Sequence, residues 1–63
     1  MSSALQLEPV LLSIPRDGGP LLPRIQRALA ARGEPLRWAI TAVESDPAGT
    51  RLWVEAVVIR LGA

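Results

Sequence analysis

Two apolar, β-branched runs near the C-terminus, residues 36–43 and 50–59, constrain the fold more than any other feature of the chain. They flank the turn sequence Asp46-Pro47-Ala48-Gly49. Valine, isoleucine, threonine and tryptophan favour strands, and a proline with a glycine two positions later is typical of a tight turn. The runs therefore predict a β-hairpin. Because the hairpin carries more apolar surface than one short helix can cover, we expect a small α+β domain that needs a partner.

A strand and a helix are expected before the hairpin. The apolar run at residues 10–14 is closed by Pro15, and Pro9 places this strand at a sheet edge or serves as its first residue, because proline cannot donate a ladder hydrogen bond. The helix should begin near Pro20 or Pro23 and run to Arg32; the residue before a proline avoids helical geometry, which favours the later start. Its apolar stripe consists of Leu22, Ile25, Ala28 and Leu29.

These elements predict a single β-α-β-β domain over residues 9–62, preceded by a candidate flexible segment at residues 1–8. The last strand is the longest and most apolar, which suits a central position. We therefore expect a three-stranded, mainly antiparallel sheet in the order 1-3-2, with the helix packed on one face and crossing over in the right-handed sense.

The turn sequence also predicts which residues share a face of the hairpin. A type I turn followed by a left-handed glycine gives a three-residue loop, which places Asp46 opposite Thr50. One face then lies under the helix and contains Leu36, Trp38, Ile40, Ala42, Leu52, Val54, Ala56 and Val58. The other face is the candidate interaction surface, an apolar band with a charged rim that consists of Trp53, Val43, Val57, Ile59, Ala39, Arg37, Arg51 and Glu55. The alternative is that residues 4–7 fold over this band.

Composition argues against common catalytic machinery. The 63 residues include no cysteine and no histidine, which removes disulfides, thiolate metal sites and the commonest general base. Gly18-Gly19 lies between a strand and a helix but lacks the spacing of a phosphate-binding loop. Glu55 faces Thr41 rather than a second acid, and no serine has a histidine to activate it. We expect no catalytic residues, no cofactor and no metal, and therefore no enzyme.

Charge gives little support for nucleic-acid binding. The net charge is +1, and all seven basic residues are arginine, which we attribute to a GC-rich genome rather than to selection for phosphate or carboxylate contacts. The N-terminal residues have no basic region before an apolar stretch, and no run reaches the roughly 18 apolar residues that a membrane span requires. We expect a cytoplasmic protein that contacts no membrane.

The function expected from these patterns is a non-enzymatic protein-interaction module. It would form a homo-oligomer, with a dimer as the simplest form, or dock as an accessory subunit on a larger complex. One alternative is weak binding of single-stranded nucleic acid through Trp53 and the flanking arginines. Another is binding of a small ligand between subunits: the element order and Trp38-Ala39 are similar to dodecins, small flavin-binding assemblies, although the helix here is shorter and the last connection tighter. Such a likeness of layout implies flavin only by analogy.

Overall fold

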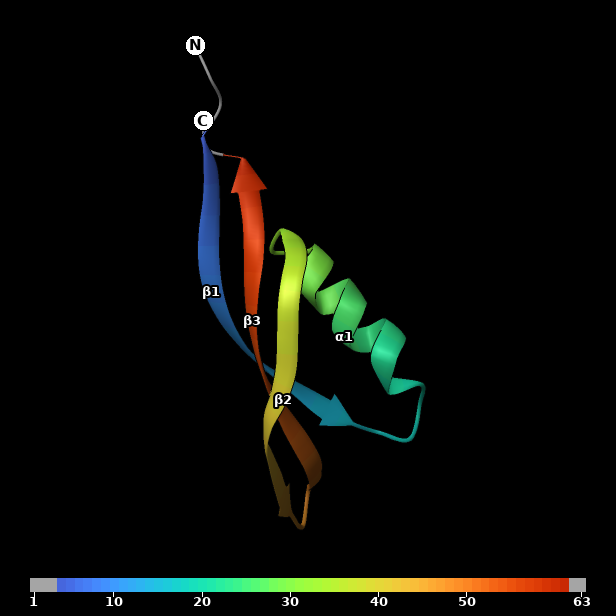
Figure 1. Ribbon diagram of the computed structural model, residues 1–63. Helices are drawn as coiled ribbons and strands as arrows, with labels where there is room; N and C mark the ends of the chain where they lie inside the picture. The colour runs from blue at the N-terminus through green and yellow to red at the C-terminus, as the bar shows by residue number, and fades with distance from the viewer. Residues whose placement is uncertain (1–3, 62–63) are drawn as a thin grey trace.

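The computed structural model describes residues 4–61 and contains three strands and one helix (Figure 1). In chain order these are β1 (Leu5–Arg16), α1 (Leu21–Ala30), β2 (Glu34–Asp46) and β3 (Gly49–Leu61). The strands form one antiparallel sheet in the order β1-β3-β2, and α1 lies against one face of it. The predicted β-α-β-β class and the predicted strand order are confirmed.

Strand β1 is longer than the sequence suggested. Residues 5–8 were expected to be part of a flexible segment, but they pair with the C-terminal end of β3, from Leu5 opposite Leu61 to Glu8 opposite Val58. Residues 1–3 of that segment lie outside the described residues. Pro9 and Pro15 both lie within β1, which is an edge strand, as the proline rule requires.

Helix α1 begins at Leu21, directly after Pro20, which is the earlier of the two expected starts and not the favoured one at Pro23. Pro23 is its third residue, which is tolerated because the first N–H groups of a helix have no carbonyl partner within it. The apolar stripe is shifted accordingly. Ile25 and Leu29 are buried as predicted, whereas Leu22 is 52% exposed and Leu21 packs against the core in its place.

The core lies between α1 and one face of the sheet, which we call the helix-side face. Side chains alternate between the two faces of a strand, so every second residue of β3 points into this core. The buried cluster contains Val10, Ile14, Ile25, Leu29, Val54, Ala56 and Val58, with Trp38 partly buried against it. Leu29, Val54 and Val58 are 0% exposed. The expected placement of Trp38 and of the even-numbered β3 residues under the helix is therefore confirmed, whereas Leu36 and Ile40, expected on the same core face, are 55% and 40% exposed.

The hairpin turn is tighter than predicted. Asp46 pairs with Gly49 rather than Thr50, so only Pro47 and Ala48 form the loop. The Asp46 side chain supports this turn, because its Oδ1 accepts hydrogen bonds from the backbone N–H groups of Ala48 (2.9 Å) and Gly49 (3.2 Å). Gly49 has a φ of 139°, a conformation that favours glycine.

Two irregularities in β2 change the register again. They lie between Pro35 and Arg37 and between Ile40 and Ala42. Beyond the second of these, Trp38 pairs with Ala56 and not with the predicted Val58. The predicted register differs from the observed one by one residue beside the turn and by two residues in the middle of the hairpin. Because a two-residue shift preserves the face, Trp38 and Ile40 still lie on the helix-side face.

The connection from α1 to β2 passes close to β3 at Gly33. A Cβ atom at this position would lie 2.9 Å from the carbonyl oxygen of Ile59 and 3.1 Å from a methyl group of Val58. The Gly33 backbone also has a positive φ of 155°. Its N–H donates to the Leu29 carbonyl oxygen (3.1 Å), which ends the helix. Glycine is therefore required for both space and conformation.

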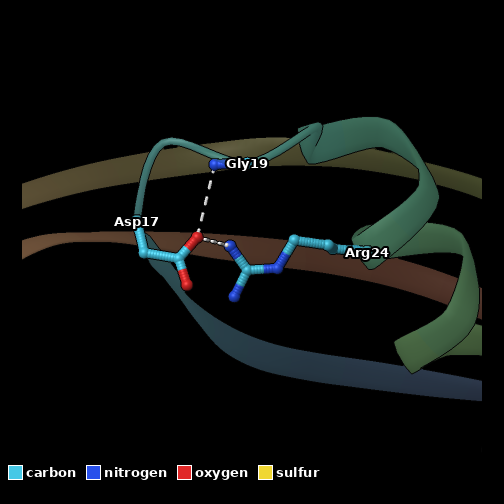
Figure 2. A network of polar contacts seen from close by, with 3 residues as sticks. All are labelled: Asp17, Gly19 and Arg24. Carbon is cyan, nitrogen blue, oxygen red and sulfur yellow. Dashed lines mark hydrogen bonds and ion pairs between the residues drawn. The ribbon is translucent and has the colours of Figure 1, made fainter.

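The loop between β1 and α1 is held by Asp17 (Figure 2). Its carboxylate accepts a hydrogen bond from the Gly19 N–H (3.4 Å) and pairs with the guanidinium of Arg24. A carboxylate therefore lies where a phosphate would have to bind in front of the helix. This arrangement favours the structural interpretation of Gly18-Gly19 as a turn.

Candidate interaction surface

The face of the sheet opposite α1, which we call the open face, carries the predicted interaction residues. The register places odd-numbered residues of β1 and β3 on it, because cross-strand partners share a face. Strand β2 contributes the residues that pair with these β3 residues. The open face consists of Leu5, Leu7, Pro9, Leu11, Ser13 and Pro15 from β1, Arg51, Trp53, Glu55, Val57, Ile59 and Leu61 from β3, and Glu34, Arg37, Ala39, Ala42 and Glu44 from β2.

An apolar strip occupies the half of the open face that lies away from the hairpin turn. Leu5 pairs with Leu61 and Leu7 with Ile59, so four large side chains lie side by side, and Leu11 continues the strip along β1. Leu5, Leu7 and Leu11 are 60–66% exposed and Leu61 is 73% exposed. Contiguous exposed apolar surface of this kind is typical of a docking site.

Polar contacts gather at the other half, near the hairpin turn. The indole N–H of Trp53 donates to Glu44 Oε1 (2.7 Å), and Arg51 donates a hydrogen bond to Ser13 Oγ. Both contacts join diagonal neighbours on adjacent strands. They fix the orientation of the half-buried Trp53 ring and leave Glu44 and Arg51 already paired within the chain.

A shallow hollow of about 560 Å³ lies over the middle of the sheet, between the apolar strip and the polar half. Its open-face lining consists of Pro9, Leu11, Arg37, Ala39, Glu55 and Val57. Ala39 and Pro9 are short side chains, which accounts for the depression. Arg37 and Glu55 line it without forming a hydrogen bond or ion pair to any other residue in the range 4–61.

Seven of the eight predicted surface residues lie on the open face: Trp53, Val57, Ile59, Ala39, Arg37, Arg51 and Glu55. The eighth, Val43, pairs with the buried Leu52 and therefore lies on the helix-side face. The placement of Val43 was wrong because the turn is one residue shorter than expected, which reverses the faces between the turn and the bulge at Thr41. For the same reason Ala42, expected in the core, lies on the open face opposite Trp53.

The β1 half of the open face was missed. The strand was expected to begin at residue 10, and residues 4–7 were considered only as a segment that folds over the candidate interaction surface. The alternation of Leu5, Leu7, Pro9 and Leu11 with polar Gln6 and Glu8 has the period of a strand and could have shown it. Since Leu5 and Leu7 are exposed on the open face, they enlarge the apolar surface rather than covering it.

The carboxylates do not form a metal-binding group. Within the part of the chain that the structure describes, no three acidic side chains come together in a way that could hold a metal ion. Glu8 lies between two cations instead, 3.0 Å from Arg60 and 3.8 Å from Arg32. Over the same residues, no helix has the length and apolarity needed to cross a membrane.

Over residues 4–61, the fold and this surface define a small α+β domain in which one helix covers part of one sheet face and leaves the other face open. The chain belongs to a protein family described as a domain of unknown function, DUF8621, whose model matches residues 5–60. That match spans all four secondary-structure elements almost completely. No curated protein and no solved structure matches the chain.

Proposed function

We propose that this domain is a non-enzymatic protein-interaction module that self-associates through its open face, with a homodimer as the expected form. The carrying observation is the apolar strip on that face, where Leu5, Leu7 and Leu11 are 60–66% exposed and Leu61 is 73% exposed. Contiguous exposed apolar surface of this kind is typical of an interaction site.

The position of the exposed apolar residues supports the open face as the site of association. The molecule is elongated, with extents of 53 × 18 × 16 Å, because its strands are 12 or 13 residues long, and α1 packs on one face of them. Four of the exposed large hydrophobic residues, Leu5, Leu7, Leu11 and Leu61, form one strip on the open face, whereas the other four, Leu22, Leu36, Ile40 and Val43, come from α1 and β2. Trp53 and Arg37, also on the open face, are residue types enriched at interfaces. Packing against a second sheet would remove this surface from water.

The sheet edges are less suited to association than the open face. Pro9 and Pro15 are six residues apart in β1, so their nitrogens face the same side of the strand, and neither can donate to an added strand. The β2 edge is interrupted by its two register shifts. Prolines and bulges are devices that discourage edge pairing, which leaves face-to-face packing as the proposed mode.

The alternatives are weaker on electrostatic and packing grounds. Base stacking on Trp53 would occur beside Glu44, which is hydrogen-bonded to the indole, and next to Glu55, two charges that repel phosphates. A flavin site like that of dodecins would have to use Trp38, which packs against the core. We therefore propose a protein partner and no cofactor. The proposed location stays the cytoplasm, since the chain has no cysteine that would need an oxidising compartment.

The test introduces a charge into the apolar strip. Leu11→Glu should abolish self-association while leaving the fold intact, because the side chain is already 60% exposed. Leu22→Glu is the matched control, since Leu22 is 52% exposed on α1 and does not belong to the sheet. Sedimentation velocity over a range of concentrations measures association, and circular dichroism measures folding. A wild-type chain that stays monomeric at high concentration would contradict the proposal and leave only docking on a different protein.

A further inference from the structure

The hollow in the open face has a charge arrangement that is complementary to itself. Arg37 and Glu55 line it with opposite charges, and neither has a partner among the residues that the structure describes. Both lie on the open face, on the neighbouring strands β2 and β3. One molecule therefore carries both halves of an ion pair in the same depression without forming the pair internally.

The register fixes how these two residues lie relative to each other. Arg37 is opposite Val57, and Ala39 is opposite Glu55. Arg37 and Glu55 are therefore diagonal neighbours, a relation in which the Cα atoms are about 7–8 Å apart. The other diagonal of the same four residues joins Ala39 and Val57. When a second copy stacks on the open face, a two-fold axis can lie between the two sheets and run parallel to the Ala39–Val57 diagonal. This axis places Arg37 of each copy opposite Glu55 of the other copy.

We propose that a second copy of this chain occupies the hollow, with Arg37 of each copy paired with Glu55 of the other. This inference rests on the proposed self-association and specifies its register. A two-fold interface uses the same patch on both subunits, so it must be self-complementary, as this diagonal is. The proposed interface forms two identical ion pairs around small side chains, which allow the two sheets to approach each other.

The surroundings of the hollow explain why such a pair can contribute. Leu11, Pro9 and Val57 line the depression together with the two charges, and packing a second sheet on them removes water from the pair. A guanidinium can then bind a carboxylate through two parallel hydrogen bonds. The apolar side chains that line the hollow, among them Leu11 and Val57, supply the driving force for association in this register. The ion pairs select the relative orientation, because misaligned sheets would leave both charges desolvated and unpaired.

Charge reversal at the two positions tests the register directly. Arg37→Glu makes both members of each intersubunit pair carboxylates, and Glu55→Arg makes both members guanidinium groups. Each variant alone should raise the dimer dissociation constant roughly tenfold or more, since like charges in an interface are strongly unfavourable. The double variant R37E/E55R should restore dimers. Arg27→Glu is the control, because Arg27 lies on the exposed side of α1.

Mixing the two single variants is the sharper experiment. In a mixed dimer, one copy supplies a carboxylate at both positions and the other copy supplies a guanidinium at both positions. Both intersubunit contacts then join opposite charges, so the mixture should dimerise although neither variant does so alone. Native mass spectrometry distinguishes the mixed species by mass, and sedimentation velocity gives its affinity. Circular dichroism of each variant verifies that the fold is retained.

The outcomes separate this inference from the proposed function. If the charge variants dimerise as the wild type does while Leu11→Glu stays monomeric, the open face associates in a different register and only the present inference fails. Absence of a mixed dimer from two folded, monomeric variants also overturns it. If Leu11→Glu dimerises normally, the proposed function fails as well.

Discussion

The two faces of the sheet are built from the same three strands, yet on β1 and β3 only the helix-side face is buried, while on β2 even Ile40 and Val43 of that face are 40% and 61% exposed. Val54, Ala56 and Val58 of β3 are at most 7% exposed on the helix-side face, whereas their neighbours Val57 and Ile59 stay half-buried on the open face. On β1, Val10 is buried and Leu11 is 60% exposed. The strands are similarly apolar on both sides, so burial is decided by the position of the ten-residue helix. Exposed apolar surface of the kind that the helix leaves on the open face is typical of interaction sites.

The largest expected effect on stability is the difference between truncating a leucine in the core and truncating a leucine on the open face. Leu29→Ala removes a fully buried side chain from α1 and should lower the free energy of unfolding by about 2–5 kcal/mol. Leu11→Ala on the open face should change the stability of the monomer by less than about 0.5 kcal/mol. Urea denaturation followed by circular dichroism, at concentrations below those that support association, measures both. Equal losses would show that the open face is not open in solution.

The two tryptophans give the next contrast. Trp38 packs against the core, so Trp38→Ala should cost about 3 kcal/mol. Trp53→Ala loses a half-buried ring and its hydrogen bond to Glu44, and should cost about 1 kcal/mol in the monomer. Thermal unfolding of dilute protein gives the order of the two variants. A larger loss at Trp53 than at Trp38 would reverse the assignment of the covered face.

Gly33 tests how closely the helix connection approaches the sheet. Gly33→Ala forces a Cβ atom against the Ile59 carbonyl in a strained conformation and should cost about 1–3 kcal/mol. Gly49→Ala is the matched control, because Gly49 also has a positive φ but no atom within 4 Å of its Cβ position. The difference in urea midpoint between the two variants measures the close contact separately from the backbone strain.

The smallest effect is expected at an exposed polar contact. Asp17→Asn removes the ion pair with Arg24 (Figure 2) and should change stability by no more than about 0.5 kcal/mol, because the Asp17 side chain is 66% exposed. The change should shrink further in 1 M salt, where the Debye length is only about 3 Å. A large loss would mean that the loop contributes more to folding than its exposure indicates.

Strand order and the covered face of β3 followed from the sequence because both depend on long-range patterns. The longest apolar strand took the centre, and alternation placed Val54, Ala56 and Val58 under the helix. The pairing of Trp38 did not follow from the sequence. It depends on the turn type and on the bulges, and these are local backbone geometries that many different sequences adopt. The face of Trp38 was still correct because the shortened turn and the bulge at Thr41 together shift the register by two residues.

The open face was only half predictable for a related reason. Its β2 and β3 residues follow from the hairpin, but its β1 residues depend on where an edge strand begins, and an edge strand with proline at its centre gives a weak signal. For this reason the sequence predicts a candidate flexible segment where Leu5 and Leu7 belong to β1. They are one side of the apolar strip because the C-terminal half of β3 offers them a pairing partner in Leu61 and Ile59.

Pro9 and Pro15 on the outer side of β1, together with the bulges of β2, have a consequence for the size of any assembly. A sheet with two intact borders can recruit strand after strand and grow into a filament. Here growth in that direction is obstructed at both borders, and in the proposed dimer the open face of each copy would be occupied by the other and closed to a third molecule. A concentrated solution should therefore stop at a finite particle and stay clear, without fibrils that bind amyloid dyes.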